Sequence, residues 1–289
     1  MKFSLLVANY NNGKYFKDCY QSILAQTYTN WEVIIVDDAS TDNSIELIQD
    51  LIAGDYRFKF FQNETNKGCG YTKRKCTELV TGEFCGFLDP DDALLPHAVE
   101  TILSGFQNNA SAVLVHSNLL FCNEELDIVK PHEGANAVNN LDKYFFNFYG
   151  AVTAFAGFSR TAYLNTEGID AYMLRAIDQD LYLKLAEVGA FVFMNEPLYL
   201  YRIHSRSISK NGNFQKAHYW HWFAVMQAAK RRNINIEDFF LKSFSSSKED
   251  DKLKKIMTGN ANGKLYLFLL KKKIIRKFAY LFNYGKNKF

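Results

Sequence analysis

The chain has 289 residues, of which 48% are hydrophobic and 16% aromatic; this supplies a large core and excludes a disordered chain. Its net charge of +3 is unevenly distributed, because residues 252–289 carry eleven Lys and Arg and no Asp or Glu, which leaves residues 1–251 with a net charge of −8. An acidic body with a basic tail argues against a protein that binds nucleic acid over its whole surface, and it predicts a local electrostatic anchor.

Apolar strands and helices alternate through the first 90 residues. The hydrophobic pattern predicts strands at Phe3–Ala8, Glu32–Val36, Phe58–Phe61 and Glu83–Leu88, and helices over residues 15–26, through Leu47 to Leu51, and over Gly68–Val80. Strands that are apolar throughout and separated by helices are typical of a parallel sheet covered on both faces. We therefore predict an α/β fold with a Rossmann-like, mainly parallel sheet.

Three of these strands end in polar residues. They are Asn9 and Tyr10 after the first strand, Asp37 and Asp38 after the second, and Asp89, Asp91 and Asp92 after the fourth. Because parallel strands share one direction, these side chains should gather at one edge of the sheet and form a nucleotide-binding crevice. The chain has no G-x-G-x-x-G after its first strand and no G-x-x-x-x-G-K-[ST], so dinucleotide dehydrogenases and P-loop phosphotransferases are disfavoured.

The stretch Asp89-Pro90-Asp91-Asp92 has two interpretations. Carboxylates so close together repel one another, and a hard divalent cation with oxygen ligands relieves this repulsion. The alternative is an acidic turn that caps a helix starting near Leu94. The stretch by itself does not decide between them.

The rest of the chain is more mixed. Helices are predicted at Pro96–Phe106, Ile177–Val188 and His218–Lys230, strands at Ala112–Phe121, Phe191–Met194 and Leu198–Ile203, polar loops at Asn123–Asn140 and Ser243–Asp251, and a basic amphipathic helix at Leu265–Leu281. The character changes near residue 210. We predict a catalytic domain over residues 1–209 and a helical C-terminal region over residues 210–289.

The cysteines and the apolar runs bear on localisation. Five cysteines without a C-x-x-C pair predict reduced thiols. The apolar run Phe3–Ala8 is too short for a signal-peptide core, and no run approaches the ~20 residues of a membrane span. We expect a cytoplasmic protein.

Several short motifs together resemble the family 2 glycosyltransferases of the GT-A fold, from the first strand to about Ser209. The matching segments are S-L-L-V-A-N-Y-N (residues 4–11), S-I-L-A-Q-T-Y (22–28), W-E-V-I-I-V-D-D-A-S-T-D (31–42), N-K-G (66–68), G-E-F (82–84), L-D-P-D-D (88–92), D-Q-D-L (178–181) and Y-R-I-H (201–204). Each is weak alone, but in this order and spacing they form a strong signal.

The resemblance implies a UDP-sugar donor. Tyr10 would stack on uracil, and Asp38 would accept the uracil N3–H, a donor that cytosine lacks. We expect one of the two residues Asp37 and Asp38 to cap the following helix and to have no other role. Asp91 would contact the ribose. The resemblance also assigns Ala8, Gly68, Lys73 and Arg202 to nucleotide-sugar binding.

The resemblance also implies a metal site and a catalytic base. Asp92, with Asp89 and His204, would hold Mn²⁺ or Mg²⁺ on the diphosphate, where the ion acts as a Lewis acid for the leaving UDP. For His204 the alternative is a packed or capping residue. Asp178 occupies the position of the base in an inverting transfer, and the alternative is a helix N-terminal carboxylate favoured by the macrodipole, a role that suits Asp180.

Three positions depart from the family pattern. Lys73, with Arg74 beside it, replaces the usual Arg and would offer the diphosphate a point charge instead of a bidentate fork. Ile177 replaces the Glu that usually precedes the base, which leaves open how the acceptor or the sugar is oriented. Ala8 replaces a common Pro.

The expected partners are a UDP-sugar and a saccharide or lipid-linked saccharide acceptor in surface polysaccharide synthesis. The basic tail would dock on anionic lipid at the inner face of the cell membrane, with about 1 kcal/mol per basic residue near the surface. The alternative is a helix that packs on the body or on a second subunit in a homodimer; salt-sensitive binding to anionic liposomes distinguishes the two.

Two other functions remain as alternatives to transfer. A nucleotidyltransferase is disfavoured because the segment after the first strand, residues 9–13, is not a Gly-rich basic loop. A non-catalytic nucleotide-sugar or glycan-binding module is disfavoured because Asp92 and Asp178 are retained.

Overall fold

A nine-stranded mixed sheet forms the centre of the fold. The computed structural model describes residues 1–148, 150–204 and 214–244. The strands are β1 (Phe3–Asn9), β2 (Trp31–Asp37), β3 (Phe58–Gln62), β4 (Phe84–Phe87), β5 (Ala93–Leu94), β6 (Ala112–Cys122), β7 (Ile128–Pro131), β8 (Ala156–Ser159) and β9 (Ala190–Arg202). Their order is β3-β2-β1-β4-β8-β6-β9-β5, with β7 paired to β6. β1 to β4 are parallel, as are β6 and β9, whereas β8 is antiparallel to both of its neighbours.

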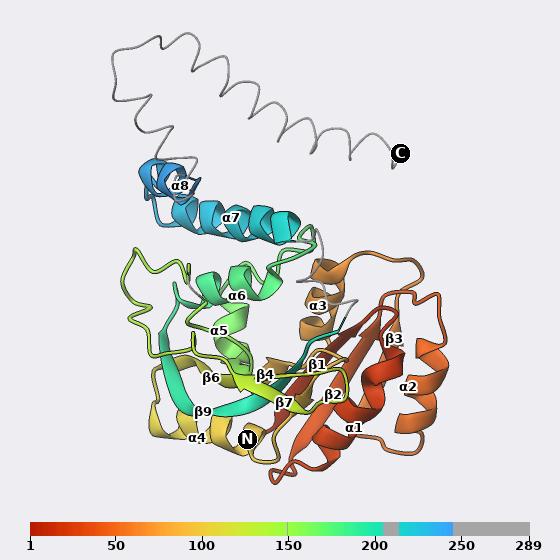
Figure 1. Ribbon diagram of the computed structural model, residues 1–289. Helices are drawn as coiled ribbons and strands as arrows, with labels where there is room; N and C mark the ends of the chain where they lie inside the picture. The colour runs from red at the N-terminus through yellow and green to blue at the C-terminus, as the bar shows by residue number, and fades with distance from the viewer. Residues whose placement is uncertain (149, 205–213, 245–289) are drawn as a thin grey trace, which may run out of the picture. The chain divides into compact units, whose positions relative to one another are not determined.

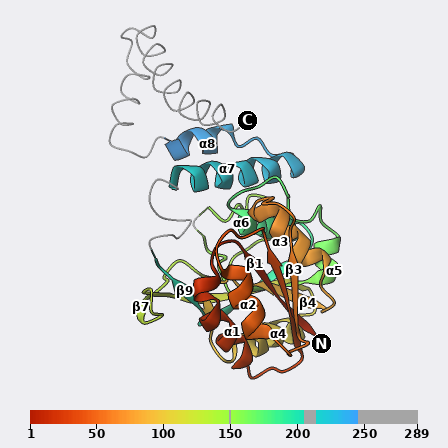
Figure 2. The same ribbon diagram turned by 90° about the vertical axis from the view of Figure 1, so that its right-hand side faces the viewer.

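Helices cover both faces of this sheet. They are α1 (Phe16–Leu24), α2 (Ser44–Ile52), α3 (Cys69–Glu78), α4 (Ala98–Asn108), α5 (Arg160–Leu164) and α6 (Ile177–Leu185), with a short 3-10 turn, η1 (Gly13–Tyr15), before α1. Figures 1 and 2 show α1, α2 and α4 on one face and α3, α5 and α6 on the other. The predicted α/β fold with a mainly parallel sheet is confirmed.

The core explains why the apolar strands are so regular. Phe3, Leu5 and Val7 point from β1 into the layer that contains α1, α2 and α4, where they meet apolar residues of all three helices. Leu6 and Ile34, from β1 and β2, are also fully buried. Burial of such a side chain stabilises the fold by about 1.5–3 kcal/mol. In a central strand the side chains on both faces are buried, so both faces add to the stability.

The predicted elements of the first 90 residues are confirmed with small shifts of their ends. One detail was wrong: Leu24, expected on the buried face of the first helix, is 42% exposed because it lies at the margin of the apolar stripe. The start of α4 also differs, because Leu94 belongs to β5 and the helix begins at Ala98. The acidic stretch at residues 89–92 therefore leads into a strand and does not cap α4.

The second half of the chain departs further from the predictions. The two predicted strands Phe191–Met194 and Leu198–Ile203 form one long strand, β9, that runs along β6 through register shifts. β7 lies inside the predicted loop Asn123–Asn140, and β8 was not predicted. The four residues of β8, A-G-F-S, are too few and too small to show a strand pattern.

Helix α7 (Phe214–Arg231) contains the predicted helix His218–Lys230 and contacts α6. The chain divides into a compact unit, Met1–Arg232, and a second unit, Asn233–Phe289, in which α8 (Glu237–Phe244) is described. The described residues do not include the predicted boundary at residues 209/210, residues 245–251 of the predicted loop or the predicted basic helix Leu265–Leu281. The structure therefore does not test these three predictions. All five cysteines are free thiols, as expected. None of the helices within the described ranges is long and apolar enough to cross a membrane.

His116 on β6 is fully buried without a polar partner. No described residue hydrogen-bonds either of its ring nitrogens, and its ring lies 5.0 Å from that of Phe193. Burial lowers the pKa of His116 from 6.5 to about 4. Between these two values the unfolded chain binds more protons than the folded one, so stability is lost as the pH falls through this window and is unaffected above it.

Replacing His116 with Leu should therefore make the protein less sensitive to acid. At pH 5 the neutral buried imidazole costs the wild type about 2 kcal/mol relative to pH 7.5, and the variant should lose that part of the pH dependence. Urea unfolding at the two pH values measures it. The exposed His97→Leu variant is the control, and an unchanged pH dependence in His116→Leu would contradict the expectation.

Candidate active site

Polar side chains meet at the carboxyl ends of β1 and β2, as predicted. Asn9 and Asp37 are register partners, and Asn9 Nδ2 donates a hydrogen bond to Asp37 Oδ2 at 2.7 Å. Asp37 also accepts hydrogen bonds from the backbone N–H of Ser40 at 2.8 Å and from its hydroxyl at 2.6 Å. Asp37 is therefore the structural member of the Asp37–Asp38 pair, although it fixes the turn at Ser40 and does not cap α2.

Asp38 binds the segment that leads into α3. Its Oδ1 accepts hydrogen bonds from Asn63 Nδ2 and from the backbone N–H of Lys67, and its Oδ2 accepts one from the backbone N–H of Gly68, each at 2.8 Å. Gly68 has a φ of +90°, which glycine adopts without steric cost. A carboxylate offers about four acceptor positions, so Oδ2 keeps one for a further donor.

The last of the three carboxylates after β4, Asp92, faces away from the crevice. It is 2% exposed, and its two oxygens accept hydrogen bonds from the Tyr199 hydroxyl at 2.7 Å and from the Arg202 backbone N–H at 2.8 Å. Burial, together with Asp91 and Asp89, raises the pKa of Asp92 well above its usual range. Asp92 thus ties the turn to β9, and this position does not support its expected role as a metal ligand.

Asp91 and His204 form a close pair at this turn. His204 Nε2 lies 2.8 Å from Asp91 Oδ2, and His204 is 3% exposed. Burial and the charge of Asp89 raise the pKa of Asp91, while the hydrogen bond with His204 opposes them. The ring of Tyr15 packs 4.7 Å from the imidazole and holds it in place.

Arg202, which the resemblance assigned to nucleotide-sugar binding, hydrogen-bonds protein groups with all three guanidinium nitrogens. Its Nε donates to the Asp91 carbonyl at 2.6 Å, one terminal nitrogen donates to Asp18 Oδ2 at 2.6 Å, and the other donates to the Glu124 carbonyl. The side chain is 2% exposed and lines neither cavity described below. These contacts favour a structural role for Arg202, in which it holds the acidic turn against α1 and the segment after β6, and its part in nucleotide-sugar binding stays a prediction.

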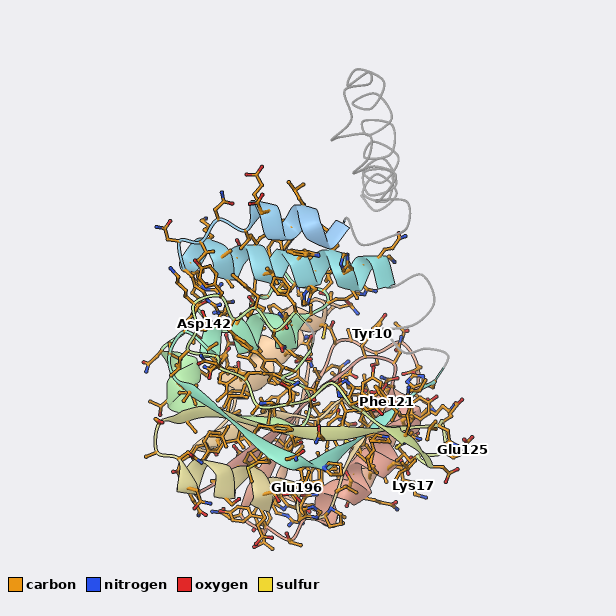
Figure 3. All side chains as sticks on the ribbon, turned by 60° about the vertical axis from the view of Figure 1, so that its left-hand side comes forward. Tyr10, Lys17, Phe121, Glu125, Asp142 and Glu196 are labelled. Atoms are coloured by element: carbon orange, nitrogen blue, oxygen red, sulfur yellow. The ribbon has the colours of Figure 1, made fainter. Side chains whose placement is uncertain are left out.

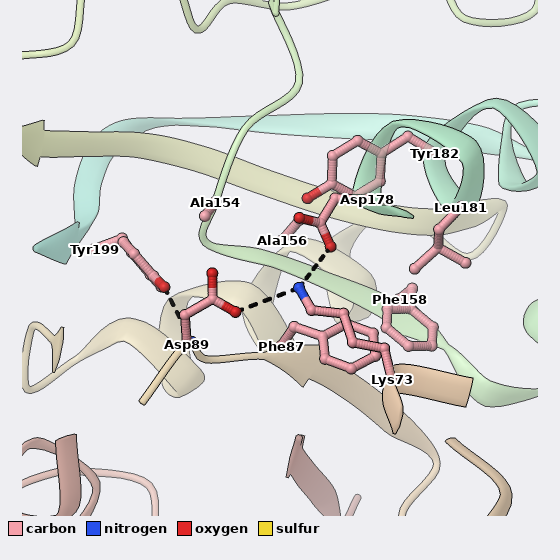
Figure 4. A pocket seen from close by; sticks show the side chains of 10 residues that line it. All are labelled: Lys73, Phe87, Asp89, Ala154, Ala156, Phe158, Asp178, Leu181, Tyr182 and Tyr199. Atoms are coloured by element: carbon pink, nitrogen blue, oxygen red, sulfur yellow. Dashed lines mark hydrogen bonds and ion pairs between the residues drawn. The ribbon is translucent and has the colours of Figure 1, made fainter. Parts of the chain in front are cut away.

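Lys73 lies between two carboxylates of the site (Figure 4). Its Nζ is 3.0 Å from Asp178 Oδ1 and 3.3 Å from Asp89 Oδ1, and it lies 4.8 Å from the centre of the Phe87 ring. Burial would lower the pKa of Lys73, but Asp178 and Asp89 outweigh it and raise the pKa well above the usual range. Arg74, by contrast, donates to Glu78 and to the Ile169 carbonyl. Only Lys73 of the two basic residues joins the site.

Asp178 stands in the first turn of α6. The preceding Ala176 has a left-handed backbone (φ 56°), and the side chain of Asp178 is 47% exposed. Asp180 faces elsewhere, as predicted, but it is buried in an ion pair with Lys184 at 2.6 Å and is not an exposed helix-end carboxylate. Asp178 is thus the carboxylate of this motif that a substrate can reach.

Two cavities share Asp178 as part of their walls. The smaller, of about 30 Å³, is lined by Lys73, Phe87, Asp89, Ala154, Ala156, Phe158, Asp178, Leu181, Tyr182 and Tyr199 (Figure 4). The larger, of about 450 Å³, is lined by Asp89, Leu119, Asn147, Phe148, Gly150, Val152, Thr153, Ala154, Ala176, Asp178, Gln179, Tyr182, Tyr199, Tyr201 and His221. They have five residues in common, so they adjoin. The volume of the larger cavity is in the range of small-molecule sites.

The remaining residues assigned to nucleotide-sugar binding lie near the ends of β1 and β2. Tyr10, labelled in Figure 3, directly follows β1 and is 46% exposed, which leaves its ring available for stacking. Ala8 precedes Asn9 on β1 and is half-buried. Gly68 is joined to Asp38 through its N–H.

Tyr182, Tyr199 and His221 line the cavities but were not predicted to. Tyr182 lies one helical turn after Asp178, a spacing that places the two on one face of α6 and would have revealed it. The pairing of β9 with β5 brings Tyr199 to the acidic turn, and His221 comes from α7. No local pattern in the sequence links these two side chains to the site.

Several known proteins resemble this chain over most of its length. The family model described as Glycosyl transferase family 2 matches residues 4–165. A chondroitin synthase of Escherichia coli is 32% identical over 80% of this chain and 33% of its own length, and a hyaluronan synthase of Pasteurella multocida is 30% identical over 82% of this chain and 24% of its own length. The chain thus spans only about a quarter to a third of these synthases.

Solved structures share the fold. Staphylococcus aureus TarS 1–349 in complex with UDP-GlcNAc has a TM-score of 0.64 at 17% identity and covers 95% of this chain and 81% of its own. The same protein in complex with UDP has a TM-score of 0.61 at 19% identity, over 78% of this chain and 65% of its own. At this level of identity the likeness shows the fold alone.

Proposed function

The chain belongs to glycosyl transferase family 2, and on this premise we propose that it transfers a sugar from a UDP-sugar to a saccharide hydroxyl with inversion at the anomeric carbon. The observation that carries the proposal is the convergence of Asp178, Lys73 and Asp89 on one cavity wall, at the carboxyl end of the strands. The proposal extends to the donor, the base, the metal and the acceptor.

Uracil recognition would fall to Tyr10 and Asp38. Tyr10 is exposed, and the free acceptor position on Asp38 Oδ2 suits a base that presents an N–H donor, as uracil does. The TarS structures, solved with UDP and with UDP-GlcNAc, share the fold in which these residues stand and support a uridine nucleotide as the donor's leaving group.

Replacing Tyr10 with Ala should weaken UDP binding. Stacking of a base on an aromatic ring is worth about 1–3 kcal/mol, so the Kd for UDP should rise by about 5- to 150-fold. Isothermal titration calorimetry measures it, with Tyr56→Ala as the matched control because Tyr56 is 90% exposed and lines neither cavity. An unchanged Kd would remove Tyr10 from the nucleotide site.

Asp178 would act as the general base. The acceptor oxygen attacks the anomeric carbon and forms the new C–O bond, the bond from that carbon to the diphosphate oxygen breaks, and the hydroxyl proton passes to the Asp178 carboxylate. Asp178 is half exposed and lines the larger cavity, so an acceptor hydroxyl can approach it. Lys73 would place its fixed positive charge near the departing diphosphate.

A divalent cation, Mn²⁺ or Mg²⁺, would be held by Asp91 and His204, with Asp89 nearby. A partly buried carboxylate with a raised pKa, 2.8 Å from a buried imidazole, is a donor set that such a cation satisfies. The described residues contain no ready cluster of three or more His, Cys, Asp and Glu. The remaining ligands would therefore be diphosphate oxygens and water, as is usual for Mg²⁺. When bound, the ion neutralises charge on the leaving diphosphate.

The acceptor would be a growing saccharide, free or lipid-linked. The support is the similarity to the chondroitin and hyaluronan synthases, both named for polysaccharides. Attachment of the basic tail to an anionic membrane surface remains a prediction.

A further inference from the structure

The larger cavity has an unusual charge composition for a site that handles saccharides. Its lining includes the two carboxylates Asp89 and Asp178 and, among the described residues, no Lys or Arg. Lys73 lines only the smaller cavity, where it is held by the same two carboxylates. A carboxylated sugar in the larger cavity would face like charges without a cation of its own.

The hydroxyl of Tyr182 has no hydrogen-bond partner among the described residues. Tyr182 is 9% exposed and lines both cavities, and no described residue forms a hydrogen bond with its hydroxyl. Burial raises the pKa of Tyr182, so the hydroxyl stays neutral and can donate and accept. Because Tyr182 lines both cavities, its hydroxyl is available to hydrogen-bond a ligand that enters them.

His221 supplies a second such group from α7. Its ring lines the larger cavity and lies 6.3 Å from that of Phe148, and no described residue hydrogen-bonds its nitrogens. Burial, with a smaller effect of His218, lowers the pKa of His221, so the imidazole is neutral near pH 7. A neutral imidazole can donate one hydrogen bond and accept another, which matches sugar hydroxyls.

The other walls provide apolar surface. Phe148, Tyr199 and Tyr201 line the same cavity, and aromatic faces pack well against the C–H faces of a sugar ring. The lining also includes the amide pair Asn147 and Gln179, in which Asn147 Nδ2 donates a hydrogen bond to Gln179 Oε1 at 3.0 Å.

We infer that the larger cavity is the acceptor subsite and that it takes an uncharged sugar, neither a uronic acid nor another anionic residue, with Tyr182 and His221 contacting the sugar hydroxyls. The inference rests on the proposed function and specifies its acceptor. Asp178, the proposed base, lines both cavities. Lys73, the cation suited to the diphosphate, lines only the smaller cavity, so the larger one is left for the acceptor.

The test measures UDP release by the full-length protein with the UDP-sugar that it turns over best, in the presence of added acceptors. The acceptors are the methyl β-glycosides of glucose, galactose, N-acetylglucosamine and N-acetylgalactosamine, compared with methyl β-glucuronide. At least one neutral glycoside should be used at least tenfold more efficiently, in kcat/KM, than the glucuronide.

The variants Tyr182→Phe and His221→Ala separate binding from a structural role. Each should raise the KM for the neutral acceptor by about 3- to 10-fold and leave the KM for the UDP-sugar within a factor of two. Tyr56→Phe and His97→Ala are the matched controls and should change neither. Melting temperatures of all variants report whether the fold is intact.

Three outcomes would overturn the inference: a glucuronide used as well as the best neutral glycoside, no neutral glycoside used at all, or a rise in the donor KM in place of the acceptor KM. The last of these would assign the larger cavity to the donor sugar. If no UDP-sugar is turned over, the proposed function itself fails and the inference fails with it.

Discussion

Replacing Asp178 with Asn should lower the rate of sugar transfer by about 10²–10⁴-fold while leaving the affinity for UDP nearly unchanged. The amide is the same size and can still accept a hydrogen bond from Lys73, which lies 3.0 Å away, but it cannot take the proton of the acceptor hydroxyl. The loss should therefore appear in kcat and not in nucleotide binding. Initial rates of transfer and calorimetric titration with UDP measure the two quantities separately.

A matched control is Asp50→Asn, which changes an exposed carboxylate on α2 that lines neither cavity. It should retain full activity. If Asp178→Asn kept more than half of the wild-type rate, Asp178 would not be the base. If it weakened UDP binding tenfold instead, Asp178 would belong to the nucleotide site.

Replacing Asp91 with Asn, or His204 with Gln, should weaken binding of Mn²⁺ or Mg²⁺ and so raise the metal concentration that activity requires. Asp91 Oδ2, in the acidic turn, lies 2.8 Å from Nε2 of His204, which follows β9. We propose these two residues as metal ligands. A metal that stabilises developing charge contributes several kcal/mol, so loss of its binding should lower the rate by at least about 10²-fold. Titration of activity with Mn²⁺ should show a higher half-saturating concentration in both variants.

Asp92→Asn provides the contrast, because Asp92 was expected from the sequence to be the principal metal ligand. Its carboxylate is buried and bonded to Tyr199 and Arg202, so the change should lower the free energy of unfolding by about 1–3 kcal/mol and leave the Mn²⁺ requirement of the folded enzyme unchanged. A raised Mn²⁺ requirement in Asp92→Asn, with none in Asp91→Asn, would restore the original assignment.

The strands that build the nucleotide edge could be predicted because they are central and apolar on both faces. β1 and β2 are seven-residue strands with almost every side chain buried, so their sequence shows one continuous hydrophobic run. Their polar ends are then placed together by the parallel direction alone. Asn9 and Asp37 are indeed register partners.

The sequence could not show which acidic residues are structural and which face the site, because this depends on β9. This strand brings Tyr199 and Arg202 against the acidic turn from about 110 residues away. Those contacts bury Asp92 and occupy Arg202, and they leave Asp91 beside His204. A motif identifies residue types at a spacing, but it does not show which oxygen each side chain presents to the crevice.

The position of β8 between β4 and β6 could not be predicted from the sequence either. A short antiparallel strand without apolar alternation gives no periodic signal, yet it places Ala154 and Ala156 at the wall of the smaller cavity. Helix α7 was predicted as a helix, but nothing local indicated that it carries His221 to the larger one.

Release of nucleoside diphosphate from a panel of UDP-, GDP-, CDP- and dTDP-sugars, with Mn²⁺ present, is the most direct test of the proposed activity. We predict release from at least one UDP-sugar, faster than from any GDP-, CDP- or dTDP-sugar and strongly reduced in Asp178→Asn. Faster release from a GDP-, CDP- or dTDP-sugar than from every UDP-sugar would contradict a uridine nucleotide as the donor, and a CDP-sugar would also contradict the role of Asp38, because cytosine has no N3–H to donate.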